Sequence, residues 1–393
     1  MFVAICTFAY IAVTAGRYDY HASIVAIAPA LGVSKLELGS VISLFAVPYG
    51  LGQFLNAFIS GRYNQRLVVF AALVLSAAAN VALPFCTTVA AMRVLWFANG
   101  IVQSFVWCSM IKTLAGNVSD KAMPNAILLS SATYPIGNFV AYGLAAIGAS
   151  IGCWKFAFFS SAGLLLAAAA TWIAVYKRRY YEHPAQDVAK PGAHARRATG
   201  RVAAFVVLTG LVTVAAYFVK DGVNSWLPSL IHETFKMSSS ASIMLTLCLP
   251  CAGVFASAAN KYFYQAVPNH SVVNASALAL CVVAAIAILP ALSCGNAAMA
   301  VACCVAMFFG MAMIANVTTS MVPLNFRSRL DSGFVAGMME TFGYVGNAIG
   351  AAVLGGIADE HGWSAVFQVV LSVAAVATVL AVCAIAAERR IRR

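Results

Sequence analysis

Six ionisable residues lie within stretches of the sequence that are otherwise long and apolar. An ionisable side chain near the centre of a lipid bilayer costs about 2.5 to 3.5 kcal/mol or more, so it usually faces a water-filled cavity or a partner. Such residues mark the paths of substrates and protons by default. The six candidates are Arg17, Asp19 and His21 in the first apolar stretch, Lys220 and Asp221 in the seventh, and Glu340 in the eleventh.

Three of these residues are cations that could bind an anion together. Arg17 and His21 are four residues apart and therefore share one face of a helix. If they surround one cavity with Lys220, their desolvated positive charge would favour a negative ligand. The alternative is that these cations only pair with the acidic residues of the same stretches and hold the helices together.

Two residues are candidate proton carriers. Glu340 is the most isolated acid, flanked by methionine, threonine and phenylalanine side chains. A carboxyl in this setting could load and release a proton near neutral pH, whereas contact with Lys220 would keep it charged, and both roles are open. His21 is the second candidate, because the charge of a histidine changes near physiological pH.

Polar and aromatic side chains could complete a substrate cavity around the cations. Each of these residue types also occurs in helix contacts and in interfacial belts, so only their occurrence together points to a cavity. The residues that we expect to contact substrate beside Arg17, His21 and Lys220 are Tyr18, Gln53, Thr133, Asn224 and Trp226.

The sequence offers no pattern typical of an enzyme or a cofactor site. Cys248 and Cys251 form a C-x-x-C, but they lie within an apolar stretch without histidine or further cysteine nearby, so a structural role is expected. We find no nucleophile with a base, no convincing metal spacing and no phosphate-binding glycine loop. The prediction is a protein without cofactor or metal.

Composition places the chain in a membrane. Hydrophobic residues make up 62% of it and charged residues 9%, whereas a soluble domain carries about 25% charged residues. Apolar runs near the ~20 residues needed to cross a bilayer recur along the whole length. The predicted fold class is an all-α integral membrane protein with twelve transmembrane helices, at 2–29, 37–60, 67–85, 89–115, 122–150, 155–176, 202–230, 240–260, 267–292, 297–323, 330–357 and 363–387.

The second half of the sequence resembles the first. A gapless shift of 199 residues lays His21 on Lys220, and four further pairs coincide: Tyr18 on Tyr217, Pro29 on Pro228, Arg62 on Lys261, and Tyr63 on Tyr262. Internal repeats of this kind are typical of two-halved membrane transporters. We expect an N-terminal six-helix bundle at 1–176, a cytoplasmic linker at 177–201, and a pseudo-symmetric C-terminal bundle with a short basic tail at 202–393, with the binding site between the bundles.

Basic residues predict the orientation. In a twelve-span arrangement eighteen of them fall on one side of the membrane and four on the other, which places both termini in the cytoplasm. We therefore expect a multi-pass protein of the cytoplasmic (inner) cell membrane, without a cleavable signal peptide, in contact with lipid and monomeric. The net charge of +12 reflects this topology and requires no nucleic-acid partner.

Several motifs resemble one known family. The chain is similar to the major facilitator superfamily, and most closely to its organophosphate:phosphate antiporter group, which carries glycerol phosphate and hexose phosphates. The resemblance covers essentially the whole chain, and its clearest pieces are Lys220 to Pro228, Tyr49 to Gln53 continuing to Gly61–Arg66, and Phe342 to Gly346 continuing to Gly362–Trp363.

That resemblance implies roles for particular residues. Arginines in the first and seventh spans of the family clamp the substrate phosphate, each eight residues before a proline. Lys220 takes the second of these places, ahead of Pro228, and His21 takes the first, ahead of Pro29. Arg17 could take the first place instead if one helical turn were inserted before Pro29.

The sequence also departs from the family. The second-span lysine is Gln53 here and the fifth-span histidine is Thr133, while Arg62 and Arg66 keep the basic part of the gating-loop motif after the second span. A lysine holds phosphate as a point charge, whereas two arginines would bind it bidentately. These departures argue against transport of a phosphate ester by phosphate exchange.

The observations together predict a secondary active transporter. Its substrate would be a small organic anion, phosphorylated or carboxylated, moved by alternating access with proton symport or with anion exchange. One alternative is a transporter-like membrane sensor that binds such a ligand without moving it. A further alternative is an efflux pump for cationic or neutral compounds, in which Glu340 and Asp19 would matter and Lys220 would be dispensable.

Overall fold

The computed structural model of the chain describes residues 2–59, 63–117, 123–175, 200–325 and 332–392. Within these ranges the secondary structure is helical and contains no strand, which confirms the predicted all-α class. The helices of the first half are α1 (Phe2–Leu31), α2 (Lys35–Ile59), α3 (Gln65–Ala82), the short 3-10 helix η1 (Leu83–Phe85), α4 (Val89–Asn117), α5 (Met123–Ser150) and α6 (Lys155–Val175).

The second half is helical in the same way but contains more breaks. A π-helical turn interrupts its fifth helix, and the last helix turns sharply at Gly362, where φ is 78°. Its elements are α7 (Gly200–Phe235), α8 (Ser239–Thr246), α9 (Cys248–Ala266), α10 (His270–Ser293), α11 (Ala297–Asn316), η3 (Val317–Met321), α12 (Val322–Asn325) and α13 (Ser332–Arg392).

Within the described residues, each of the twelve predicted apolar runs lies mainly on a helix, on consecutive helices, or on one arm of α13. By length and composition alone, nine segments of the described residues are apolar enough to span a membrane. The two arms of α13 are counted as one of these segments. The linker predicted at 177–201 lies almost wholly outside the described residues, but α7 begins at Gly200, inside its end.

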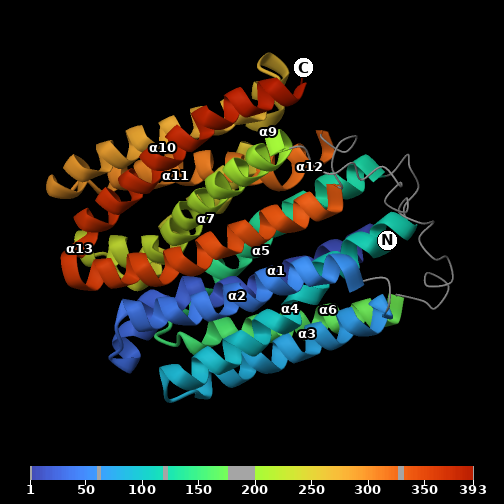
Figure 1. The fold of residues 1–393 in the computed structure, drawn as a ribbon. Coiled ribbons are helices and arrows are strands. Elements are labelled where there is room, and N and C mark those ends of the chain that lie inside the picture. Colours follow the sequence, from blue (N-terminus) through green and yellow to red (C-terminus); the bar gives the residue numbers. More distant parts are fainter. Residues whose placement is uncertain (1, 60–62, 118–122, 176–199, 326–331, 393) are drawn as a thin grey trace.

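The helices gather in two groups. Figure 1 shows α1 to α6 on one side of the molecule and α9 to α11 on the other, with both chain termini at the same end. Helix α13 packs against both α7 and α2, and α5 packs against α8, so these contacts join the groups.

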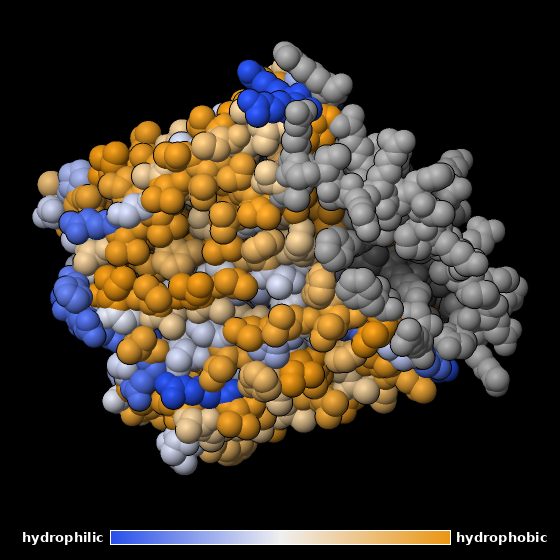
Figure 2. All heavy atoms as spheres, in the orientation of Figure 1, coloured by the Kyte–Doolittle hydropathy of each residue, from blue (hydrophilic) through white to orange (hydrophobic). Residues whose placement is uncertain are grey.

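Apolar side chains cover the outside of the helices. Figure 2 shows a largely hydrophobic face, with hydrophilic residues mainly toward its ends. A surface of this kind suits lipid, because hydrocarbon chains offer apolar contacts and no partners for polar groups. Examples from one helix, α2, are Leu44, Val47, Leu51 and Leu55.

An ion-pair network shuts one end of the molecule, and we call it the turn-end network. Lys35, at the α1–α2 turn, has its Nζ 3.0 Å from Glu233 Oε1 of α7 and 3.1 Å from Asp359 Oδ1 of α13. Trp363 Nε1 donates to Glu233 Oε2 at 2.9 Å. Gly355 lets the backbones approach here, because a Cβ at that position would lie 2.8 Å from the Lys35 carbonyl oxygen. Both groups of helices are therefore tied together at this end.

Candidate substrate cavity

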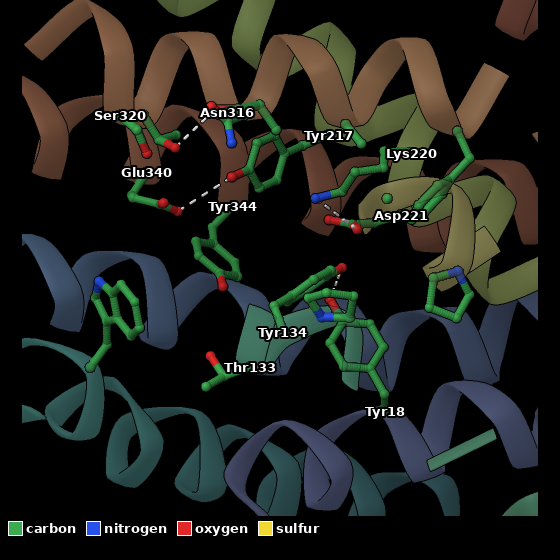
Figure 3. Close-up of a pocket in the computed structure, with 18 of the residues that line it drawn as sticks. Tyr18, Thr133, Tyr134, Tyr217, Lys220, Asp221, Asn316, Ser320, Glu340 and Tyr344 are labelled. Atoms are coloured by element: carbon green, nitrogen blue, oxygen red, sulfur yellow. Dashed lines mark hydrogen bonds and ion pairs between the residues drawn. The ribbon is translucent and has the colours of Figure 1, made fainter. Parts of the chain in front are cut away.

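A cavity of about 290 Å³ lies between the two groups of helices. Figure 3 shows Lys220, Asp221, Tyr217 and Glu340 on one wall and Thr133, Tyr134 and Tyr18 on the other. The charged residues that line it are one lysine and two carboxylates. The aromatic part of the wall consists of Tyr10, Tyr18, Trp107, Tyr134, Tyr217, Phe308 and Tyr344.

Lys220 reaches the cavity from the middle of α7. Its Nζ lies 3.4 Å from Asp221 Oδ1 and 4.0 Å from the centre of the Tyr217 ring. Asn347 of α13 donates to the other oxygen of Asp221, at 2.8 Å. The ammonium is thus held by one carboxylate and by an aromatic face, both of which stabilise its charge.

Glu340 reaches the cavity from α13. The hydroxyl of Tyr217 donates to its Oε2 at 3.5 Å, a long hydrogen bond. Tyr217 therefore stands between the two charged groups, with its ring face toward Lys220 and its hydroxyl toward Glu340. The fold places a cation and an acid on one wall, on helices that pack against each other.

Arg17 lies behind the cavity wall. It is 3% exposed and does not line the cavity. Its Nε donates to Gln103 Oε1 at 3.1 Å, and one terminal nitrogen donates to the Tyr344 hydroxyl at 3.1 Å. The guanidinium carbon sits 4.0 Å from the centre of the Tyr49 ring. Arg17 therefore reaches the cavity only through the hydroxyl of Tyr344.

His21 does not reach the cavity. Its Nδ1 lies 2.6 Å from Ser225 Oγ, and that hydroxyl donates to the Asp221 carbonyl oxygen at 2.7 Å. Because a serine has one hydrogen to donate, the His21 Nδ1 must be the donor toward Ser225. The expected group of three cations around one chamber is not brought together, since Lys220 alone lines it among the three.

Three of the other predicted contact residues line the cavity and two do not. Tyr18, Gln53 and Thr133 are part of the wall, and the Tyr18 hydroxyl lies 3.0 Å from that of Tyr134. Asn224 and Trp226 are buried toward the shut end, where the helices touch. The Trp226 Nε1 donates to the Ala351 carbonyl at 3.0 Å, and so serves the packing of α7 on α13.

The predicted gating-loop arginines lie away from the cavity. Arg62 falls outside the described residues, and Arg66 donates to the Ile173 carbonyl at 2.8 Å, near the end of α6. Between them, Tyr63 donates to Asn56 Oδ1 at 2.9 Å, and burial raises the pKa of its phenol, which keeps it a neutral donor. These contacts tie α2, α3 and α6 together at the end opposite the turn-end network.

The sequence profile described as Major Facilitator Superfamily matches residues 3–331. The chain belongs to the major facilitator superfamily. The fold agrees: a bacterial homologue of the lysosomal transporter Spinster, inward-facing and unoccupied, is similar with a TM-score of 0.75 at 16% identity, over 98% of this chain and 95% of that one. The nucleoside transporter NupG gives a TM-score of 0.73 at 14% identity, over 98% of both chains.

Curated relatives support the resemblance to the organophosphate:phosphate antiporter group. A glycerol-3-phosphate transporter of Bacillus subtilis (strain 168) is 26% identical over 231 residues, which are 51% of this chain and 50% of the relative. The membrane sensor protein UhpC of Salmonella typhimurium is 24% identical over 230 residues, again 51% of this chain and 50% of the relative. The chain therefore spans about half the length of these relatives, and none of the four similar proteins is named as an enzyme.

Within this major facilitator protein, sequence reasoning missed several cavity residues, among them Tyr217 and Tyr344. Tyr217 entered only as the partner of Tyr18 in the 199-residue shift, and Tyr344 only as part of a glycine-containing motif. The repeat was the usable signal, because it pairs two tyrosines that both line the cavity. Among the described residues no three His, Cys, Asp or Glu side chains form a metal-binding group, and Cys248 and Cys251 are free.

Proposed function

We propose that this chain is a secondary active transporter that moves a small organic anion together with a proton by alternating access. The observation that carries the proposal is the charge of the cavity wall, which combines one ammonium with two carboxylates. The halves at 1–176 and 202–393 would rock about this cavity, with both termini in the cytoplasm and the chain in the cytoplasmic membrane, as a monomer.

Lys220 would hold the anionic group of the substrate. Its Nζ has three hydrogens, and the contact with Asp221 leaves donors that can turn into the cavity. Tyr344 would add a second donor, because its hydroxyl accepts from Arg17 and its own hydrogen is free to point elsewhere. Arg17 thus acts on the substrate through Tyr344, while Tyr18, Gln53 and Thr133 shape the opposite wall.

Glu340 would carry the proton. When it is ionised, the wall holds two carboxylates against one ammonium, and an anion is repelled. When it is protonated, Asp221 and Lys220 balance each other, and the anion can replace Asp221 in part of its contact with the ammonium. Proton loading and anion binding therefore favour each other, and the coupling is reciprocal. His21, held by Ser225 away from the cavity, is the weaker candidate.

The cavity favours a carboxylate with an apolar or aromatic body. The name of the Bacillus subtilis relative specifies a phosphate ester, glycerol 3-phosphate. A phosphate dianion gains most from bidentate arginines, yet here the arginine stands behind Tyr49 and Tyr344 and only a lysine lines the wall. Seven aromatic side chains, in contrast, offer apolar faces to a larger organic acid.

Uptake by proteoliposomes tests the proposal. Organic acids that raise the melting temperature of the purified protein would be supplied as radiolabelled substrates, with and without an imposed acidic exterior. We expect the pH gradient to drive accumulation, Lys220→Ala to reduce uptake at least about tenfold, and Glu340→Gln to abolish the response to the gradient while exchange of labelled for unlabelled acid continues. Arg390→Ala, an exposed cation far along α13, is the matched charge control.

Other outcomes would select other functions. Uptake that is unchanged in Lys220→Ala would favour the efflux pump, if the transported compounds are cations or neutral. Exchange without any response to the pH gradient in the native protein would favour anion exchange. Ligand binding without flux would favour a sensor, a reading supported by the name of the Salmonella relative.

A further inference from the structure

The interior of the first six helices contains a buried acid that the cavity does not use. Asp19 of α1 is 0% exposed. Its Oδ1 accepts from the backbone N–H of Tyr20 at 2.7 Å, and among the described residues the Ser161 hydroxyl is the one side-chain group that interacts with the carboxyl. Its neighbours in sequence, Arg17 and His21, point to other partners. An acid without a counter-ion inside a lipid-embedded bundle is costly and is usually functional.

Three other polar side chains lie on this helix and on the two helices packed against it. The Ser161 hydroxyl of α6 interacts with the Asp19 carboxyl and makes no other hydrogen bond in the described structure. Ser23 follows Asp19 by one turn on the same face of α1, and its Oγ is unpaired. Asn80 of α3 donates to the Gly16 carbonyl at 2.9 Å and keeps an unpaired Oδ1.

The unpaired hydroxyl of Ser23 is unusual for this molecule. Thr14 and Thr213 both turn back and donate to the carbonyl four residues earlier, at 2.9 and 2.8 Å, as hydroxyls in membrane helices commonly do. Ser23 has the same option through the Asp19 carbonyl but does not take it. Its oxygen therefore stays available to another ligand.

The charged groups on the packed helices lie elsewhere. Arg66 of α3 binds the Ile173 carbonyl, toward the opposite end of the bundle, and Lys155 of α6 lies over the rings of Phe85 and Trp154 at a turn. The charged groups on the described residues of α3 and α6 thus do not pair with Asp19. Nothing on the described residues of α3 or α6 supplies the positive charge that it needs.

We propose that Asp19, Ser23, Asn80 and Ser161 form a binding site for one sodium ion. Hard cations take oxygen ligands, and the four groups come from three helices that pack together. One carboxylate balances one positive charge, whereas a divalent ion would leave a charge uncompensated in the bundle. A proton on Asp19 would give a hydrogen to a single neighbour and leave the other oxygens unpaired, so it fits the set less well.

The site is tested by equilibrium binding of ²²Na⁺ to the purified protein at about pH 8. Choline replaces sodium in the control buffer. We expect about one sodium ion per chain, and a melting temperature that rises with sodium but not with choline. Asp19→Asn should reduce bound sodium to background, and Ser161→Ala should weaken binding by about tenfold or more. Glu360→Gln, an exposed acid beyond the network, should bind sodium like the native protein.

Two results would overturn the proposal. One is an absence of sodium binding by the native protein at every pH from about 6 to 9, which would leave Asp19 as a protonated acid. The other is unchanged sodium binding in Asp19→Asn. If that variant fails to fold, Ser161→Ala decides, since alanine removes only a hydroxyl and unchanged affinity there would also contradict the site. Binding is measured without transport, so the outcome is independent of the function proposed for the cavity.

Discussion

Replacing Lys35 with alanine should loosen the end of the molecule that the turn-end network shuts. Lys35 makes two ion pairs, at 3.0 Å to Glu233 and 3.1 Å to Asp359, and the side chains are 16%, 41% and 25% exposed. Pairs that are partly open to water contribute ~0.2–1 kcal/mol each, so together they supply about 0.4 to 2 kcal/mol to the closed arrangement. The bond from the Leu36 backbone N–H to Asp359 does not involve the lysine side chain and should remain.

The expected effect is a shift of the equilibrium between closed and open forms of that end. A change of about 0.4 to 2 kcal/mol corresponds to roughly a two- to thirtyfold gain of the open form, because 1.36 kcal/mol is tenfold. Hydrogen exchange measured by mass spectrometry would detect it as faster exchange in peptides that cover the α1–α2 turn, the end of α7 and the bend at Gly362. The η1 segment, Leu83–Phe85, takes no part in the network and serves as an internal control.

A matched variant separates the network from a general loss of charge. Glu360→Gln changes the residue next to Asp359, but its partner is His361 at 3.7 Å and both side chains are exposed. Its exchange should equal that of the native protein. Equal exchange in Lys35→Ala and in the native protein would refute the reasoning, because the network would then contribute nothing to closure.

Three further outcomes can be checked on the purified protein. Gly346→Ala should lower the free energy of unfolding by about 1–3 kcal/mol, because a Cβ there overlaps the Val214 carbonyl of α7. Gly163→Ala is the control and should not lower it, because a Cβ there meets nothing within 4 Å. Denaturant titration in detergent compares the two variants. Glu388→Gln should lower the free energy of unfolding by about 1–3 kcal/mol in the same titration. The buried carboxylate accepts hydrogen bonds from the backbone N–H and the hydroxyl of Ser271, both at 2.8 Å, and from the backbone N–H of His270. Tyr344→Phe should weaken anion binding about tenfold or more by calorimetry, since it removes the hydroxyl that Arg17 binds and keeps the ring.

The positions of the helices could be predicted because lipid imposes a length and a composition on every span. Breaks within a span could not be predicted from length and composition. The break between α8 and α9 and the π-helical turn η3 both lie inside long runs of high average hydropathy, so hydropathy treats each run as one helix. Gly362 was visible only as part of a family motif, and its positive φ is what turns α13 back on itself.

The candidate site could be predicted in part. Spacing correctly placed Arg17 and His21 on one face of α1, but it could not say which way that face points. Tyr18, one residue after Arg17, lines the cavity instead. Successive side chains of a helix point in directions about 100° apart around its axis. A rotation of the helix by that amount therefore exchanges the residues that face the cavity with residues that face neighbouring helices. The sequence of α1 is apolar on all sides of this cluster and gives no rotational reference.

The position of α13 connects the cavity with the shut end of the molecule. Glu340 and Asp359 lie on the same arm of this helix, before the turn at Gly362, and 19 residues separate them. At 1.5 Å per residue this is about 28 Å of helix, and no break in it would absorb a displacement. Gly343 fixes the arm against Tyr217, since a Cβ there would lie 2.9 Å from the ring. A substrate that moved Tyr217 on binding Lys220 would therefore push on the helix that carries both Glu340, the proposed proton carrier, and Asp359 of the turn-end network. This would give a physical route from binding to opening.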